Sequence, residues 1–194
     1  MTTDRVGTIV EMGKITTEHD TDAPLEDRLI EIRSEISALL RERVKGGERV
    51  GVVIETPTTQ KAGKAYKNQN PARAAIYGAV VGMMIATIHG YGGTGFRNYR
   101  CVRADQWPRV VACPPHKGDP YKWPRVVYAA EVFNLKLSEF GAKSKGASDI
   151  ADACLLTLYG TSLSWDLGIP CRYIIGIDPG LRTGYAVLEL DRPA

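Results

Sequence analysis

Residues 173–189 read YIIGIDPGLRTGYAVLE, and this stretch decides the fold. Two mainly apolar runs, 173–178 and 183–189, flank a Pro-Gly turn, which predicts a β-hairpin. Asp178 ends the first run and is therefore expected at the rim of a sheet. A carboxylate at the end of a buried strand needs a reason other than packing, because charged side chains are rarely buried without a partner.

The rest of the chain mixes strands with helices. Apolar spacing and turn residues predict strands over residues 5–16, 48–56 and 99–104, and helices over residues 24–45, 71–90, 119–133 and 148–159. This succession predicts a layered α/β domain. The pentapeptide WPRVV occurs at residues 107–111 and again at 123–127, and we interpret the repeat as a coincidence because the flanking residues share nothing further.

Length and composition favour one globular domain over residues 1–194. The chain is 44% hydrophobic and 24% charged, with a mean hydropathy of −0.17. No apolar stretch approaches the roughly 20 residues of a membrane-spanning helix, and no secretory signal is evident. The four cysteines are scattered, which disfavours a zinc site or a disulfide framework. We expect a cytoplasmic protein without a membrane partner.

Charge is segregated along the chain. Residues 61–145 hold 14 basic and 4 acidic side chains, a net charge of +10, whereas the remainder carries −7, so that the whole chain has a charge of only +3. A strongly basic segment favours a polyanionic partner such as nucleic acid.

Four carboxylates lie where packing explains them poorly. Glu55 ends the apolar run 50–54 as Asp178 ends its own, and Asp149 and Asp152 are three residues apart, which places them on one face in the first turn of the predicted helix. If the four converge, their repulsion calls for a divalent cation with oxygen ligands, and Mg²⁺ or Mn²⁺ suits such a site. Two such ions can activate water for phosphodiester hydrolysis.

Three segments together resemble the RuvC-type Holliday-junction resolvases of the RNase H-like superfamily. Residues 174–185 resemble the first family strand with its turn, residues 53–55 the central strand with the second acid, and residues 148–153 the terminal helix with two acids one turn apart. The resemblance implies an α/β fold with an RNase H-like mixed five-stranded sheet and helices on both faces.

The order of the acids departs from the family, which runs Asp, Glu, Asp, Asp. Here the order begins with Glu55 and ends with Asp178, which indicates a circular permutation with the first two family strands at the C-terminus. Residues 5–16 would then be the third strand, beside residues 183–189. As an alternative, the C-terminal hairpin could pair with the sheet of a partner subunit.

The resemblance also implies an activity: a homodimeric, structure-selective endonuclease that resolves four-way DNA junctions by paired nicks, leaving 5′-phosphate and 3′-hydroxyl ends. The alternatives are a nuclease acting on forks, flaps or RNA-DNA hybrids, and a non-catalytic junction-binding protein. The implied metal ligands, for two Mg²⁺ or Mn²⁺ ions per site, are Asp178, Glu55, Asp149 and Asp152, and Lys122 is the implied catalytic lysine. The expected DNA-binding residues are Lys61, Lys64, Tyr66, Lys67, Arg73, Lys117 and Lys143.

Overall fold

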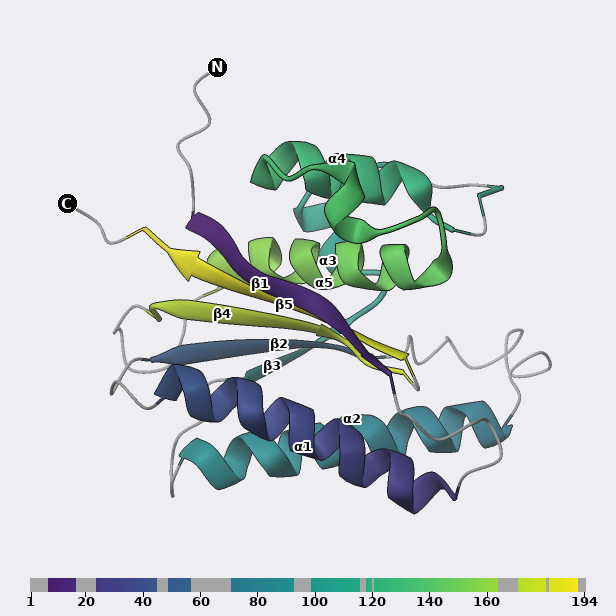
Figure 1. Ribbon diagram of the computed structural model, residues 1–194, viewed down its shortest axis with the longest axis vertical. Coiled ribbons are helices and arrows are strands. Elements are labelled where there is room, and N and C mark those ends of the chain that lie inside the picture. The colour runs from purple at the N-terminus through teal and green to yellow at the C-terminus, as the bar shows by residue number, and fades with distance from the viewer. Residues whose placement is uncertain are drawn as a thin grey trace.

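Five strands form one mixed β-sheet in the computed structural model of the chain, in the spatial order β1-β5-β4-β2-β3 (Figure 1). The structure describes residues 7–16, 24–44, 49–56, 71–92, 99–115, 118–119, 121–163, 171–180 and 182–191. The strands are β1 (Gly7–Thr16), β2 (Val50–Thr56), β3 (Tyr99–Arg103), β4 (Tyr173–Asp178) and β5 (Arg182–Leu190). The helices are α1 (Leu25–Val44), α2 (Pro71–Gly92), α3 (Trp107–Val110), α4 (Trp123–Phe133) and α5 (Lys145–Thr161), with a short 3-10 helix η2 (Leu137–Phe140).

Strand β4 lies at the centre of the sheet and is paired differently on its two sides. It is antiparallel to β5 and parallel to β2. Strand β1 pairs antiparallel with β5, as predicted for residues 5–16 and 183–189, and Gly7 lies opposite Leu190. The C-terminal hairpin thus pairs within its own chain. Its turn is held by Thr183, whose buried hydroxyl donates to the carbonyl oxygen of Gly180 at 2.8 Å.

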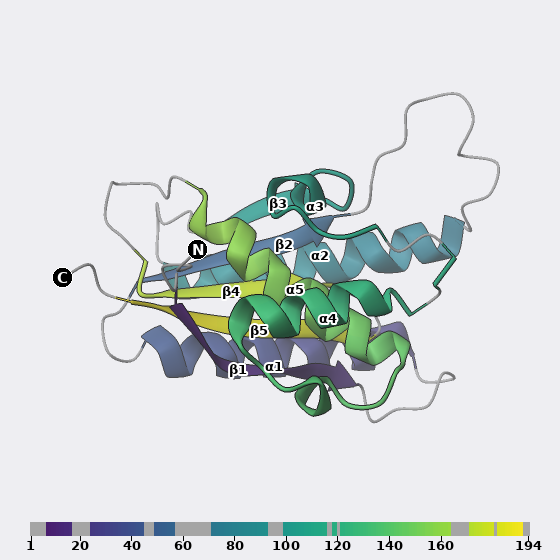
Figure 2. The ribbon, with the colours of Figure 1, turned by 90° about the horizontal axis from the view of Figure 1, so that it is seen from above.

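Helices cover both faces of the sheet, which confirms the predicted three-layer α/β arrangement. Helices α1 and α2 lie on one face, while α5 lies on the other face with α3 and α4 beyond it (Figure 1). Seen from above, α5 runs across β4 and β5 (Figure 2). Each face has its own core of buried apolar side chains. Leu155 and Leu156 of α5 are fully buried, and each contributes about 1.5–3 kcal/mol of hydrophobic free energy.

Two strand glycines allow α5 to approach the sheet closely. A Cβ atom on Gly176 of β4 would collide with the carbonyl oxygen of Ala153, and one on Gly184 of β5 would collide with that of Asp149. Any side chain at these positions would push α5 away from the sheet. The small residues in the hairpin therefore set the depth at which α5 lies.

Two predicted helix starts differ from the structure. Helix α4 begins at Trp123 and not at Asp119, because the Asp119 carboxylate accepts hydrogen bonds from the backbone N–H groups of Tyr121 and Trp123 and forms a turn there. Helix α5 begins at Lys145, three residues earlier than predicted, and is capped by the Ser144 hydroxyl. Helices α3 and η2 were not predicted.

The repeated pentapeptide has the same structural role in both copies. Each copy begins a helix with its tryptophan, Trp107 in α3 and Trp123 in α4, and has proline within the first turn. Proline suits this position because its fixed φ is helical and its missing N–H would have no partner there. In both places the pentapeptide is thus a helix-starting sequence.

Replacing Gly184 by alanine tests the close packing of α5. The added Cβ would meet the α5 backbone, so the free energy of unfolding is expected to fall by about 1–3 kcal/mol in urea denaturation. Gly90→Ala in α2 is the matched control, because a Cβ there meets nothing within 4 Å. That variant is expected to keep its stability or to gain up to about 1 kcal/mol. Equal stability of the two variants would contradict the packing described.

Candidate active site

The register between β2 and β4 brings two carboxylates together. Ile54 pairs with Ile177 in parallel strands, so the next residues, Glu55 and Asp178, lie side by side at the carboxyl ends of these strands. Alternation along the strands turns Ile54 and Ile177 toward the α1–α2 core. Glu55 and Asp178 therefore point to the other face, where α5 lies.

Helix α5 supplies the other two acids from the same face. Asp149 is 6% exposed and Asp152 is fully buried. Because α5 begins at Lys145, both acids lie beyond the first turn, and the expectation that they sit in that turn is wrong. The contact between Gly184 and the Asp149 backbone fixes this part of the helix against the hairpin.

Three of the four acids line one pocket, which we call the acid pocket and which has a volume of about 510 Å³. Four basic side chains line it as well, so it offers both carboxylates and cations to a ligand. The residues lining the acid pocket are Arg28, Glu55, Ile76, Tyr77, Lys122, Lys145, Asp149, Asp178, Pro179, Gly180 and Arg182.

Asp152, the fourth acid, does not line the acid pocket and is bound by two cations. Lys122 Nζ donates to Asp152 Oδ2 at 2.5 Å, and Arg125 NH1 donates to Oδ1 at 2.9 Å and to Oδ2 at 3.2 Å. Lys122 reaches this position from the residue before α4, where its backbone is left-handed with φ 48°. The predicted catalytic lysine is thus at the acid pocket, and the carboxylate that holds it there is Asp152.

Glu55 is held by two aromatic residues. Trp107 Nε1 donates a hydrogen bond to Glu55 Oε2 at 2.6 Å, and the indole is fully buried. The Tyr77 hydroxyl donates to the Glu55 backbone oxygen at 3.4 Å. Tyr77 faces the acids from α2, and burial together with the charge of Asp178 raises its pKa well above the ordinary value.

Burial and mutual repulsion disfavour the ionised form of the three carboxylates that line the acid pocket. Burial raises the pKa of Asp178 well above 3.8, and the negative charges of Glu55 and Asp152 raise it further. The pKa values of Glu55 and Asp149 are also raised, in both cases mainly by burial. Burial lowers the pKa of Lys122, but the charge and hydrogen bond of Asp152 outweigh burial, so that the pKa is raised.

The fit of a divalent cation differs among the four acids. Glu55, Asp149 and Asp178 offer carboxylate oxygens to the acid pocket and form no ion pair with the described Lys or Arg residues, so their donor chemistry fits Mg²⁺ or Mn²⁺. Asp152 has both oxygens occupied by Lys122 and Arg125, and its role as a metal ligand stays a prediction. In the described part of the chain, no group of three or more Asp, Glu, His or Cys side chains has an arrangement that would hold a metal ion.

Sequence reasoning missed several residues of the site. Trp107 and Arg125 belong to the two copies of the pentapeptide, and that repeat was the one available signal for them. The basic residues Arg28, Lys145 and Arg182 carry no such signal, because they come from three different elements that meet only in the fold. Lys145 and Arg182 both act to lower the pKa of Asp149, which indicates that they lie near it.

Most of the predicted DNA-binding residues cannot be placed. Lys61, Lys64, Tyr66, Lys67 and Lys117 lie outside the described residues. The same holds for the side chain of Arg73, whose backbone is in the first turn of α2. Lys143 is exposed and lies 3.5 Å from Asp119 Oδ2, with its Nζ over the Trp123 ring at 5.9 Å.

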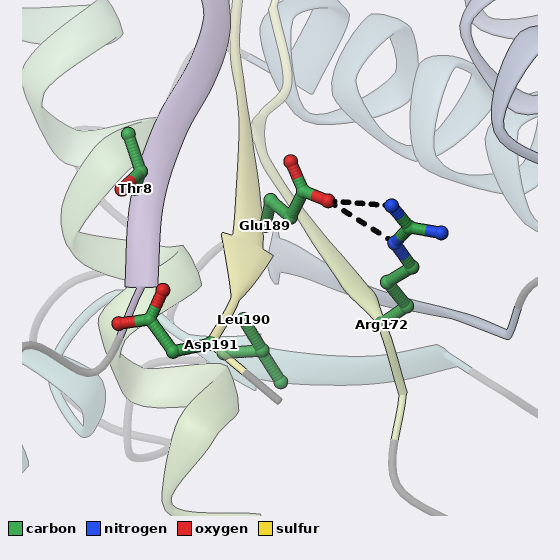
Figure 3. Close-up of a pocket in the computed structure, with 5 residues that line it drawn as sticks. All are labelled: Thr8, Arg172, Glu189, Leu190 and Asp191. Atoms are coloured by element: carbon green, nitrogen blue, oxygen red, sulfur yellow. Dashed lines mark hydrogen bonds and ion pairs between the residues drawn. The ribbon is translucent and has the colours of Figure 1, made fainter. Parts of the chain in front are cut away.

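A second cavity, of about 280 Å³, lies at the opposite end of β4 and β5. The register places it there, because Tyr173 pairs with Glu189 whereas Asp178 pairs with Gly184. Glu189 and Arg172 line this cavity and bind each other, with Arg172 NH2 2.9 Å from Glu189 Oε1 (Figure 3). Since these two opposite charges satisfy each other, this cavity gives no indication of a ligand.

Comparison with protein-family models, with curated proteins and with solved structures finds no match to this chain. Among the described helices, none has the combination of length and apolar character needed to cross a membrane.

The raised pKa of Asp178 predicts a stability that depends on pH. The folded state binds this proton more tightly than the unfolded chain, so the free energy of unfolding falls as pH rises above 3.8 through the raised value. Without divalent ions, Asp178→Asn is therefore expected to melt at a higher temperature than the native protein at pH 7.5. The difference should shrink as pH approaches 4, where the native carboxyl is increasingly protonated.

Thermal unfolding followed by circular dichroism measures this effect. Asp191→Asn is the matched control, because Asp191 is exposed at the far end of β5, and its melting temperature should follow that of the native protein. An Asp178→Asn variant less stable than native at every pH would contradict the described crowding of carboxylates at the acid pocket.

Proposed function

We propose that this chain is a metal-dependent endonuclease with an RNase H-like fold that resolves four-way DNA junctions. One observation carries the proposal: carboxylates from β2, α5 and β4, which come from three separate parts of the sequence, line one pocket together with basic side chains. Hydrolysis of a phosphodiester uses basic side chains that bind the negative phosphate and carboxylates that hold a divalent metal ion. The acid pocket offers side chains of both kinds.

The strand arrangement supports the fold part of the proposal. The resemblance assigns β4, β5 and β1 as the first, second and third family strands, which form an antiparallel meander. In this chain β4 pairs antiparallel with β5, and β5 pairs antiparallel with β1. Strand β2, which carries Glu55, is parallel to β4 on its other side. This agrees with a circular permutation in which the first two family strands lie at the C-terminus.

The proposed roles follow from the contacts in the pocket. Glu55, Asp149 and Asp178 would hold Mg²⁺ or Mn²⁺, and two such ions would activate the attacking water and stabilise the leaving oxygen. Lys122 would donate to a phosphate oxygen at the pocket, since Asp152 keeps its ammonium group there. Arg28, Lys145 and Arg182 would bind neighbouring phosphates.

The α2 helix supports a homodimer, which two symmetric nicks in one junction require. Its exposed side carries the small residues Ala75, Gly78, Gly82 and Ala86 at helical spacing, and a Cβ on either glycine would meet nothing within 4 Å. Such a surface permits two helices to approach closely. Tyr77, near the start of this helix, lines the acid pocket. We therefore propose α2 against α2 of a second copy as the interface.

Junction cleavage tests the proposed activity. In the presence of Mg²⁺, the native protein is expected to cut a synthetic four-way junction and leave 5′-phosphate ends, and Asp178→Asn is expected to be slower by more than about 100-fold. Forks, flaps and RNA-DNA hybrids at the same salt concentration test the other nuclease substrates. Asp191→Asn should cleave like the native protein.

Two results would overturn this assignment. Equal cleavage by the native protein and Asp178→Asn would remove the acid pocket from the reaction. Junction binding without cleavage in either Mg²⁺ or Mn²⁺ would favour the non-catalytic junction-binding protein instead.

Light scattering during gel filtration tests the dimer. The native protein is expected to elute with twice the mass of one chain, and Gly82→Arg with the mass of one chain, because a long charged side chain would separate two closely packed helices. Ser34→Arg on the exposed side of α1 is the control and should stay dimeric. A Gly82→Arg variant that remains dimeric would place the interface elsewhere.

A further inference from the structure

The two copies of the WPRVV pentapeptide meet in the fold beside the acid pocket. The first copy contributes Trp107 and the second contributes Arg125, whose guanidinium carbon lies 5.3 Å from the centre of the Trp107 ring. The side chains at the same positions of the other copy, Trp123 and Arg109, do not form this contact in the structure: Trp123 lies under Lys143, and Arg109 is exposed. One residue from each copy thus takes part in the contact, and Trp123 and Arg109 are the equivalent residues that serve as controls.

Each member of this pair binds one of the acids. Trp107 Nε1 donates to Glu55 Oε2 at 2.6 Å, and Arg125 NH1 donates to Asp152 Oδ1 at 2.9 Å. The result is one continuous series of contacts from Glu55 through the indole and the guanidinium to Asp152. It connects Glu55 of β2 with Asp152 of α5 through side chains of α3 and α4.

Packing alone does not account for these residues. The indole of Trp107 has one N–H group, which donates its hydrogen bond to a carboxylate. Arg125 is only 12% exposed, and its Nε is buried without a hydrogen-bond partner among the described residues. An apolar side chain of similar size would fill the space without burying an unsatisfied polar atom, which costs free energy. The arrangement is therefore better explained by control of the two carboxylates.

We propose that Trp107 and Arg125 are positioning residues that fix Glu55 and Asp152 relative to each other at the acid pocket. Trp107 binds only Oε2 of Glu55, which leaves Oε1 without a hydrogen bond from the described residues and available to the pocket. Arg125 shares Asp152 with Lys122 and so also determines where Lys122 is held. This inference rests on the proposed nuclease function for its catalytic consequence, but the contacts themselves can be tested without DNA.

The indole signals of the protein labelled with ¹⁵N-tryptophan test the contacts. The chain has three tryptophans, and Trp→Phe variants assign their three N–H signals. Glu55→Ala and Arg125→Lys are each expected to move the Trp107 signal, the first upfield because the carboxylate acceptor is lost. The Trp123 signal should stay in place. A Trp107 signal that is unchanged in Glu55→Ala would overturn the proposal.

Steady-state cleavage of a four-way junction in Mg²⁺ tests the consequence. Trp107→Phe, which loses the donor but keeps an aromatic ring, is expected to lower kcat about 10- to 100-fold with KM for the junction unchanged. Arg125→Lys is a second variant should Trp107→Phe fold poorly, and it should lower kcat in the same way. The equivalent changes in the other copy, Trp123→Phe and Arg109→Lys, are the controls.

The outcomes separate the two proposals. If the native protein cuts the junction while Trp107→Phe and Arg125→Lys both match their controls, the positioning role is wrong and the nuclease stands. If the native protein cuts none of the substrates, the nuclease assignment and the catalytic consequence both fail, and the indole signal still decides whether Trp107 binds Glu55. A drop in kcat of equal size in the controls would show a general loss of structure and would also overturn the positioning role.

Discussion

The parallel pairing of β2 with β4 is the constraint on which the rest of the site depends. It ends both strands at the same edge, and it places the half-buried Glu55 beside the half-buried Asp178 at the acid pocket. Two half-buried carboxylates side by side repel each other and each loses part of its solvation, so the fold gains nothing from this pairing in itself. The surrounding elements must therefore either compensate the charge or leave it for a ligand.

Both solutions are present within a few side chains. Asp152 is compensated fully by Lys122 and Arg125, and Glu55 is compensated in part by the Trp107 N–H group. Asp149 and Asp178 accept no hydrogen bond to their carboxylates from the described residues. Stability and proposed function thus oppose each other here, because the carboxylate charges that destabilise the metal-free fold are the ones that would bind a divalent cation.

Much of the architecture was predictable because local patterns determine it. The apolar spacing of residues 24–45 predicted α1 nearly to its ends, and the Pro-Gly turn predicted the β4–β5 hairpin. The failures were also local. Asp119 is a residue type that often caps helices, but its side chain forms a separate turn before α4. The stretch Gly146–Ala147 has no apolar periodicity, so the sequence pattern did not reveal the true start of α5.

By itself the sequence determined which acids end strands and which share a helix, since periods of two and 3.6 residues are properties of the backbone. It could not determine that Asp152 binds Lys122 and Arg125 while Asp149 faces the acid pocket. That difference depends on how deeply α5 packs on Gly176 and Gly184 and on which side chains α3 and α4 bring to it. Only the tertiary structure decides it, because electrostatic partners are chosen by distance in space and not by separation along the chain.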